Sequence, residues 1–477
     1  MAVPIEFTVV IVRRSTLDER FPGGVSGYAA RHGNGSLAMD DHLVGVGFMG
    51  ATDVERLLKS LELEGLVLVR DDAFADVAIV TVIGGLTLSC DWLEYDRGRC
   101  WLAGTDPGEV VERASQIEER RAPGPVGRSL LGLAIGDCLG AGVEGWSAAD
   151  IRQAHTSTAG YVRSFAYDPM VWTDDTQQAL TLIEATARFG FPEPTWVADR
   201  WVEMSDRGIH RGTGRGFRAA IDTYRTTGDL AVSGRSDRAG NGAAMRIAPT
   251  AVALRELSDD DFVRHLVAVS LVTHREGRAL AGMLAVAFVT RALAEGFYPP
   301  RKQRAKAILT ELVPWLRDRE VELEYNPTVV LEPPRTHEIS EAFDGLTERI
   351  DEGWPTVAEW IVGHATECRG EPTGLGEGFV TASVVTAVAW TIVSGCSLPT
   401  TLTEAVGFGD DTDTVAAMCG GMAGTGAPRE TLRPGWQGFA GRDELLTWAK
   451  AVDAGADVDG LPDVLGLEDR LTGIRYA

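Results

Sequence analysis

Two acidic clusters in the sequence place carboxylates close enough together to share a cation. Near the C-terminus, Asp410, Asp411 and Asp413 occupy three of four consecutive positions and lead directly into the apolar segment 414–423. Residues 173–176 (Thr-Asp-Asp-Thr) contain the same Asp-Asp-Thr tripeptide and also precede an apolar segment. Such crowding of like charges destabilises a fold unless a cation lies among them.

The two clusters have a structural and a chemical interpretation. Asp and Thr at the start of a helix accept hydrogen bonds from free backbone N–H groups, so each cluster could serve only as a helix cap. A cap does not require three carboxylates, however, and Mg²⁺, Mn²⁺ and Ca²⁺ take carboxylate and hydroxyl oxygens as ligands. We therefore expect two helix N-termini to face each other and hold one or two divalent ions. The candidate ligands are Thr173, Asp174, Asp175, Asp411, Asp413 and Thr414.

Further residues that could do chemistry stand in glycine-rich surroundings. Glu144 follows a small-residue helix expected at 129–140, and it is either a solvated loop carboxylate or part of the same site. The loops 210–217 and 239–251 hold glycines that allow backbone N–H groups to approach a phosphate closely, although neither matches a Walker or Rossmann pattern. His274 ends an apolar segment, where packing or capping is the ordinary alternative to ligand binding.

The elements that position these residues follow from the periodicity of apolar side chains. After residue 128, apolar residues recur at helical spacing, and Gly, Pro and Asp separate the segments. We therefore expect an all-α domain over 129–477. Its helices are expected around 129–140, 175–189, 260–273, 278–295, 304–316, 379–394, 414–423 and 443–453.

The first part of the chain has a different pattern. Short β-branched segments predict strands, and the segment 52–65 has apolar residues at helical spacing. We expect a small α+β domain of unknown role over 1–117, joined to the helical domain by a charged, Pro/Gly-rich linker over 118–128. The strands are expected at 5–12, 43–49, 66–70, 77–82 and 86–92.

Composition limits the classes of function. The 477-residue chain has a formal net charge of −24, which disfavours a nucleic-acid-binding surface over the whole molecule but leaves room for a local basic groove. The six cysteines contain no Cys-x-x-Cys pair and no secretory signal peptide is recognisable, so we expect reduced thiols and a cytoplasmic location. The uncharged segment 378–399 is long enough to cross a bilayer, but its Ser and Thr residues favour a buried helix, and we expect no membrane partner.

Five motifs are similar, in this order, to those of a known family. They are GLAIGDCLGAGVE (132–144), WTDDTQQAL (172–180), RGTG (211–214), GNGAAMRIAP (240–249) and GDDTDTVAAMCGGMAG (409–424). Together they resemble the ADP-ribosylglycohydrolases, which include dinitrogenase reductase-activating glycohydrolase and the eukaryotic ADP-ribosylarginine and ADP-ribosylserine hydrolases. The resemblance implies a predominantly α fold, an orthogonal all-α bundle, with a binuclear Mg²⁺ or Mn²⁺ site at the bottom of a cleft.

The resemblance also implies roles for individual residues. The six candidate ligands match the family's metal-binding positions. Glu144 matches an acidic residue that acts in catalysis in some members, and we expect Asp411 and Asp413 to share that work. Phe379 is expected near the adenine. The remaining contacts to ADP-ribose are expected from Gly212, Gly214, Gly240, Asn241, Gly242 and His274.

Two departures from the family pattern concern this site. The family usually has Gly at the position of Asp410, so the added carboxylate either alters the choice of metal or points to solvent. Residues 237–239 (Asp-Arg-Ala) stand where several relatives have Ser and an aromatic residue, which changes the contacts expected to ribose and diphosphate.

The predicted activity is removal of ADP-ribose from a modified target, with two Mg²⁺, or Mn²⁺, as cofactors. The target is expected to be a protein side chain, arginine by family frequency, or another ADP-ribosylated molecule, and a nucleic-acid target stays open. One alternative is a binding or immunity protein that neutralises an ADP-ribosyltransferase toxin through the N-terminal domain. Another is a catalytically silent relative, although all six ligand positions are filled.

Overall fold

The computed structural model of the chain divides into two units, Met1–Ala122 and Pro123–Ala477, which are described separately. The boundary between them falls inside the expected linker. In the first unit the structure describes only the backbone of six strands. In the second unit it describes all residues except 156, 159–160, 162–169, 237, 298–300, 332–336, 426–438 and 477, with the backbone alone at 301–304.

The first unit contains a four-stranded sheet and a separate antiparallel pair of strands. The sheet has the order β2–β3–β1–β4, in which β1 is antiparallel to β3 and parallel to β4. Three of the predicted strands overlap β1, β3 and β4, whereas the predicted helix at 52–65 and the strands at 66–70 and 86–92 lie outside the described residues. The strands are β1 (Thr8–Arg13), β2 (Gly35–Ala38), β3 (Leu43–Phe48), β4 (Ile79–Thr81), β5 (Leu93–Asp96) and β6 (Arg99–Leu102).

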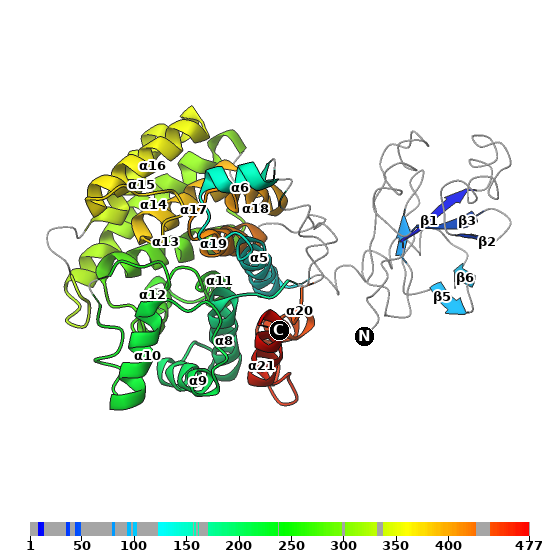
Figure 1. Ribbon diagram of the computed structural model, residues 1–477, viewed down its shortest axis with the longest axis horizontal. Coiled ribbons are helices and arrows are strands. Elements are labelled where there is room, and N and C mark those ends of the chain that lie inside the picture. The colour runs from blue at the N-terminus through cyan, green and yellow to red at the C-terminus, as the bar shows by residue number, and fades with distance from the viewer. Residues whose placement is uncertain are drawn as a thin grey trace. The chain divides into compact units, whose positions relative to one another are not determined.

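The second unit is predominantly helical, as predicted (Figure 1). Two helices, α5 (Pro125–Gly140) and α19 (Thr412–Thr425), pack along each other in its middle. The other helices are α6 (Ala148–His155), α8 (Asp174–Phe189), α9 (Pro194–Arg207), α10 (Arg215–Thr227), α11 (Ala248–Ala253), α12 (Asp259–Ser270), α13 (Gly277–Ala294), α14 (Arg301–Glu324), α15 (Glu338–Arg349), the 3₁₀ helix η3 (Ile350–Glu352), α16 (Trp354–Arg369), α17 (Val380–Val393), α18 (Leu398–Ala405), α20 (Arg442–Ala454) and α21 (Val464–Arg475).

Small residues bring α5 and α19 into backbone contact. A Cβ atom added at Gly132 would overlap the carbonyl oxygen of Gly420, and one added at Gly136 would overlap that of Ala416. One turn further along α5, a Cβ at Gly140 would overlap the backbone of Asp413. These contacts ascend α5 while they descend α19, so the two helices are antiparallel. The C-terminal end of α5 therefore fixes the N-terminal end of α19, where the second acidic cluster lies.

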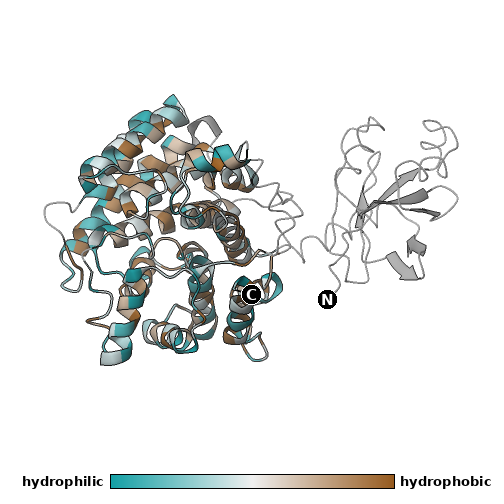
Figure 2. Ribbon diagram, viewed as in Figure 1, coloured by the Kyte–Doolittle hydropathy of each residue, from teal (hydrophilic) through white to brown (hydrophobic). Residues whose placement is uncertain are grey.

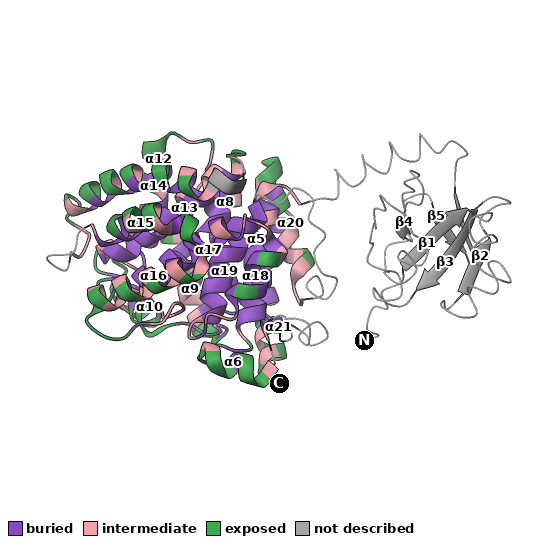
Figure 3. Ribbon diagram, turned by 90° about the horizontal axis from the view of Figure 1, so that it is seen from above, coloured by how far each residue is buried: buried purple, intermediate pink, exposed green. Residues whose placement is uncertain are grey.

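Burial decreases from this pair outward. Figure 3 shows buried residues concentrated on α5, α17 and α19, and exposed residues along α6, α10 and α12. Figure 2 shows the corresponding hydropathy: outer helices such as α10 and α16 carry both hydrophilic and hydrophobic residues. The core is thus built from apolar segments that are easily recognised in the sequence, and amphipathic helices cover it.

The uncharged segment 378–399 contains α17, which has 14 residues and lies buried in the helical unit. By length and composition one described helix, α13, could cross a membrane, and 72% of its apolar window is buried inside the unit. A Cβ added at Gly282 of α13 would overlap the side chain of Val380 of α17, so these two apolar helices pack on each other. Both are core helices of this unit.

Candidate functional site

The N-terminus of α8 is capped from another helix. Thr173 is the N-cap residue, but its side chain makes no capping hydrogen bond. Instead, the carboxylate of Asp137, on α5, accepts hydrogen bonds from the backbone N of Thr173 (2.8 and 3.0 Å to its two oxygens) and of Thr176 (3.0 Å). It also accepts from both threonine hydroxyls, at 2.8 and 2.6 Å. Because Asp137 supplies the cap, Asp174 and Asp175 are not needed for it, and the capping interpretation of this cluster fails.

The N-terminus of α19 is fixed in a comparable way. The hydroxyl of Thr412 donates to the carbonyl oxygen of Gly140 at 2.8 Å, which ties the first turn of α19 to the end of α5. Asp413 Oδ1 accepts from the backbone N of Thr414 at 2.9 Å. Asp411 Oδ2 accepts from Asn241 Nδ2 at 2.7 Å, so the glycine-rich loop before α11 orients this carboxylate.

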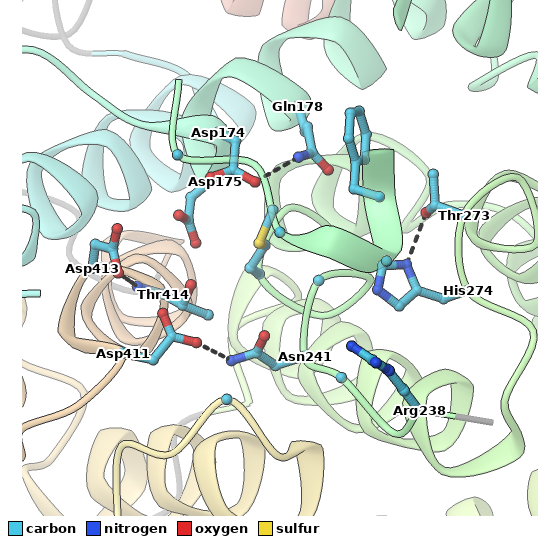
Figure 4. Close-up of a pocket in the computed structure, with 18 of the residues that line it drawn as sticks. Asp174, Asp175, Gln178, Arg238, Asn241, Thr273, His274, Asp411, Asp413 and Thr414 are labelled. Atoms are coloured by element: carbon cyan, nitrogen blue, oxygen red, sulfur yellow. Dashed lines mark hydrogen bonds between the residues drawn. The ribbon is translucent and has the colours of Figure 1, made fainter. Parts of the chain in front are cut away.

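The two acidic clusters meet in space (Figure 4). The hydroxyl oxygen of Thr173 lies 2.8 Å from Asp137 Oδ1, 3.0 Å from Asp175 Oδ2 and 3.4 Å from Asp413 Oδ2. One hydroxyl proton can serve only one of these three acceptors. In addition, Asp175 Oδ1 is buried and has no hydrogen-bond partner among the described residues. Buried carboxylate oxygens in excess of the available donors fit a bound cation.

The carboxylates form two overlapping groups that could each hold a metal ion. One group is Asp137, Asp175 and Asp413, and the other is Glu144, Asp411 and Asp413. In each group one oxygen per residue lies within 4.8 Å of the others. Asp413 belongs to both groups, so two cations could share it. With only oxygen donors present, Mg²⁺, Mn²⁺ and Ca²⁺ are the ions that this ligand set suits.

Burial and mutual repulsion raise the pKa values of these carboxyl groups. Burial, and then the charges of Asp137 and Asp411, raises the pKa of Asp174 to about 8. Burial, and then the charge of Asp175, raises the pKa of Asp413 well above its usual range. Burial also raises the pKa of Asp175 well above its usual range. Burial, followed by the charge of Asp411, also raises the pKa of Glu144 at the exposed edge of the cluster. A divalent cation would offset this repulsion.

A pocket of about 500 Å³ opens over the cluster. All predicted site residues line it except two: Thr173, which is fully buried and lies next to Asp175 and Asp413, and Phe379, which was expected near the adenine. The pocket lining that the predictions name comprises Glu144, Asp174, Asp175, Gly212, Gly214, Gly240, Asn241, Gly242, His274, Asp411, Asp413 and Thr414. Residues separated by up to 270 positions in the chain thus contribute to one cavity, since 414 minus 144 is 270.

Glycine is required at Gly212 and at Gly242 for different structural reasons. Gly212 has a φ of +81°, which favours glycine, and a Cβ there would stand 2.9 Å from Asp174 Oδ1. At Gly242 the reason is space, because a Cβ would stand 2.7 Å from Cε1 and 2.8 Å from Nε2 of His274. Gly240 forms an isolated antiparallel bridge with Phe379, the residue expected near the adenine. The loop therefore packs against both His274 and the start of α17.

Several residues of the site were not predicted from the sequence. Asp137 caps α8, while Arg238 and Glu377 line the pocket. Gln178 also lines the pocket, and its side-chain oxygen accepts a hydrogen bond from the fully buried Arg246. A signal for Asp137 existed, because it is the only charged residue in the apolar segment 129–140. Arg246 gives the same signal, as a lone charge in the apolar stretch 243–249.

Asp410 occupies the position where the resemblance led to an expectation of glycine, and it has a φ of +61°. Asp tolerates this left-handed region better than most residues, so the substitution keeps the backbone conformation. Its backbone N donates to the carbonyl of Trp146 at 2.8 Å, and its carbonyl accepts from the N of Gly145 at 2.7 Å. Asp410 lines the pocket, but it belongs to neither of the two carboxylate groups that could hold a metal.

Comparison with known proteins assigns the chain to a family. The family model for ADP-ribosylglycohydrolase matches residues 119–461. The chain belongs to this family. The match covers most of the unit Pro123–Ala477, and the unit Met1–Ala122 precedes that unit in the chain.

Three curated relatives are similar to this ADP-ribosylglycohydrolase. ADP-ribosylarginine hydrolase Tri1 of Serratia proteamaculans is 28% identical over 221 residues, which are 45% of this chain and 56% of that protein. ADP-ribosylhydrolase ARH3 of Homo sapiens is 23% identical over 339 residues, 65% of this chain and 86% of that protein. An uncharacterized protein of Archaeoglobus fulgidus is 28% identical over 305 residues, 62% of this chain and 85% of that protein. A solved structure described as an ADP-ribosylglycohydrolase-related protein complex has a TM-score of 0.49 and 24% identity, over 70% of this chain and 98% of that one.

Proposed function

We propose that this protein is a divalent-metal-dependent hydrolase that removes ADP-ribose from modified arginine side chains. The observation that carries the proposal is the meeting of the two acidic clusters. Three carboxylates converge on the one hydroxyl of Thr173, and Asp175 Oδ1 is buried with no partner in the part of the chain that the structure describes. A fold that only needed helix caps would not retain this arrangement, because an unneutralised buried carboxylate is costly.

Two Mg²⁺ ions, or Mn²⁺ in their place, fit the donor set. The proposed ligands are the oxygens of Thr173, Asp174, Asp175, Asp411, Asp413 and Thr414, with Asp137 supporting them from α5. When bound, such ions would neutralise the carboxylates, lower the pKa of a water molecule and orient hydroxyl groups of the ribose.

The residues of the chain position the reacting groups. Asn241 holds Asp411 through its side-chain amide, and Asp137 holds Thr173. Glu144, at the exposed edge of the cluster, takes a proton from the attacking water, and its raised pKa suits it to return that proton to the leaving group. The water oxygen forms a bond to the anomeric carbon of the ribose, the bond from that carbon to the target nitrogen breaks, and the nitrogen leaves protonated.

The opposite side of the pocket suits the nucleotide. Gly240, Asn241 and Gly242 present a narrow loop that allows close approach, and His274 packs against it. Arg238 lies exposed on the pocket lining, and Figure 4 shows its side chain on the side of His274, away from the carboxylates. We assign the diphosphate of ADP-ribose to this side, because a guanidinium and backbone N–H groups complement phosphate oxygens.

The choice of arginine rests on the charge of the pocket edge. Glu377 and Asp410 line the pocket in addition to the candidate metal ligands, and the charge of Glu377, after burial, raises the pKa of Asp410. A guanidinium leaving group pairs with carboxylates through two parallel hydrogen bonds, whereas a serine hydroxyl gains no such partner. The name of one relative, the ADP-ribosylarginine hydrolase Tri1 of Serratia proteamaculans, agrees with this choice.

The test is release of free ADP-ribose from ADP-ribosylated arginine, serine and nucleic acid, each with Mg²⁺ and with EDTA. We expect release from arginine with Mg²⁺, loss of release with EDTA and loss in Asp413→Asn, whereas Asp469→Asn, an exposed site on α21, keeps the activity. Release only from serine or nucleic acid would refute the arginine assignment. If no substrate releases ADP-ribose with either Mg²⁺ or Mn²⁺, the alternative of a catalytically silent relative is supported instead. A pull-down of an ADP-ribosyltransferase toxin with and without residues 1–120 tests the binding alternative.

A further inference from the structure

Arg246 is a fully buried cation that no step of the proposed chemistry uses. It lies just before α11, at the end of the glycine-rich loop, and its guanidinium carbon is 4.6 Å from the ring centroid of Trp201. One guanidinium nitrogen donates to Gln178 Oε1, and another donates to the hydroxyl oxygen of Thr273 at 2.6 Å. Burial lowers the pKa of Arg246 to about 9, so it stays charged at neutral pH. A guanidinium has donors only, so the direction of both hydrogen bonds is fixed.

The direction of these bonds determines where the next protons lie. The hydroxyl of Thr273 accepts from Arg246, and it also lies 2.8 Å from His274 Nδ1. Among the described residues the hydroxyl proton has no acceptor other than this Nδ1. The hydroxyl therefore donates to Nδ1, which must be the unprotonated nitrogen of the imidazole. A neutral His274 then carries its proton on Nε2.

The environment of His274 supports the neutral form. Burial, and then the charge of Arg246, lowers the pKa of His274 to about 3. The ring packs against Gly242 and lines the pocket, and Figure 4 shows it on the side of Arg238, across the cavity from the acidic cluster. Within the described part of the chain, Nε2 has no hydrogen-bond partner. A protonated Nε2 would thus offer an unused donor to a ligand in the pocket.

The same cation orients a group on the metal side. Because Gln178 Oε1 accepts from Arg246, its Nε2 is directed to Asp174 Oδ2, at 2.8 Å. The guanidinium of Arg246 therefore sets two features of the pocket. It fixes the orientation of the Gln178 amide next to Asp174, and it fixes the position of the proton on His274.

We propose that Arg246 is a positioning residue which, through Thr273, holds His274 as an Nε2–H donor to an acceptor oxygen of the ADP-ribose. This inference rests on the proposed function for the identity of the ligand. The proton position on His274, in contrast, is a property of the protein without substrate, so it can be tested separately.

The first experiment measures the imidazole tautomer. Protein labelled with ¹⁵N-histidine is examined by long-range ¹H–¹⁵N correlation in the presence of Mg²⁺ and without ADP-ribose, and the variant His274→Gln identifies the signals of His274. We expect the Nε2–H tautomer in the unmodified chain. In Thr273→Val, which removes the hydroxyl but keeps the shape, we expect a mixture of tautomers, whereas Thr273→Ser keeps Nε2–H. An Nδ1–H tautomer in the unmodified chain overturns the proposal.

The second experiment measures binding by titration calorimetry with ADP-ribose and, separately, with Mg²⁺ alone. We expect Thr273→Val to weaken ADP-ribose binding about tenfold, the loss of one hydrogen bond, while the Kd for Mg²⁺ stays unchanged and Thr273→Ser binds like the unmodified chain. These variants replace a direct change at Arg246, whose loss from the core would impair folding. Equal ADP-ribose affinity of Thr273→Val and the unmodified chain overturns the proposal. Absence of ADP-ribose binding by the unmodified chain with Mg²⁺ refutes the proposed function instead, whatever the tautomer.

Discussion

Replacing Gly242 with alanine tests whether His274 must keep its position for the substrate to bind. The added Cβ would stand 2.7 Å from Cε1 and 2.8 Å from Nε2 of His274. Carbon atoms of unbonded groups are in favourable contact at about 3.5–4.0 Å, so the imidazole has to move by roughly 1 Å. The φ of Gly242 is not positive, so the backbone conformation at this position does not require glycine. The substitution therefore acts on the position of the His274 ring.

The size of the effect follows from that displacement. Nε2 of His274 is the proposed donor to ADP-ribose, and a hydrogen bond that lengthens by about 1 Å is lost. Misplacing a positioned group by this distance can reduce activity about 100-fold. We therefore expect the Kd for ADP-ribose to rise about 10- to 100-fold, which corresponds to about 1.4–2.8 kcal/mol. The affinity for Mg²⁺ is expected to stay unchanged, because the three atoms nearest to the added Cβ all belong to His274.

A matched control lies in the same pocket. Gly216 also lines the cavity, and a Cβ added there would meet no described atom within 4 Å. Gly216→Ala should bind ADP-ribose nearly as the unmodified chain does, in titration calorimetry with saturating Mg²⁺. A thermal unfolding curve for each variant confirms that both are folded. If Gly242→Ala and Gly216→Ala bind ADP-ribose equally well, His274 does not contribute to nucleotide binding and the reasoning fails.

Three further predictions concern charge. Asp175→Asn should raise the unfolding temperature in EDTA, because it removes a repelled buried charge, and it should abolish the stabilisation by Mg²⁺ that the unmodified chain shows, about 2.7 kcal/mol at 100 times Kd. Arg238→Ala should weaken ADP-ribose binding about tenfold and reduce its dependence on salt, since a phosphate contact is lost. Burial raises the pKa of Glu320 from 4.5 to about 7, so between these values the folded state holds a proton that the unfolded chain has lost. The free energy of unfolding should therefore fall by roughly 2–3 kcal/mol as pH rises from 4.5 to 7, and Glu320→Gln should remove this part of the decrease in urea titrations.

Each of these predictions has a matched control and a contrary result. Asp469→Asn and Arg218→Ala make the same charge changes at exposed residues outside the pocket, and Glu359→Gln does so on α16. Equal stabilisation of Asp175→Asn and Asp469→Asn by Mg²⁺ would exclude Asp175 as a ligand. Equal affinity of Arg238→Ala and Arg218→Ala for ADP-ribose would remove Arg238 from the binding site. Parallel pH profiles for Glu320→Gln and the unmodified chain would show that Glu320 ionises normally.

The position of the two acidic clusters at helix N-termini could be predicted from the sequence because the motifs are local, whereas their meeting was expected from the excess of carboxylates and from the family resemblance. Each Asp-Asp-Thr tripeptide directly precedes an apolar helical segment, so both stand at helix N-termini whatever the fold. The long apolar segments likewise gave α5, α8, α13 and α17 correctly, because burial on all sides leaves a clear signal. Helices such as α9 and α10 were missed, since only a few of their residues are buried and the rest of each helix is polar.

Contacts between distant segments could not be predicted in the same way. Asp137 caps a helix that begins 37 residues later, since 174 minus 137 is 37, and no local pattern connects the two. Arg246 depends on Gln178 and Thr273, each from a different segment, so its role appears only when the fold brings them together. The capping alternative for the first cluster could not be judged from the sequence for the same reason, because the carboxylate that accepts the N-terminal N–H groups of α8 belongs to Asp137 on α5.

The end of α5 explains why these groups keep their relative positions. Asp137 and Gly140 are three residues apart and therefore lie on one face of the helix. On this face Asp137 binds the N-terminus of α8, while Gly140 allows the backbone of Asp413 to approach and accepts a hydrogen bond from Thr412. A single rigid turn thus sets the distance between the two acidic clusters, and Glu144 follows where the helix has ended. A side chain at Gly140 would push the backbone of Asp413 away from α5, and with it the acidic cluster of α19 away from the cluster of α8. Gly140→Ala should therefore abolish Mg²⁺ binding, although no ligand is changed. Calorimetric binding of Mg²⁺ by folded Gly140→Ala with normal affinity would contradict this account of the site.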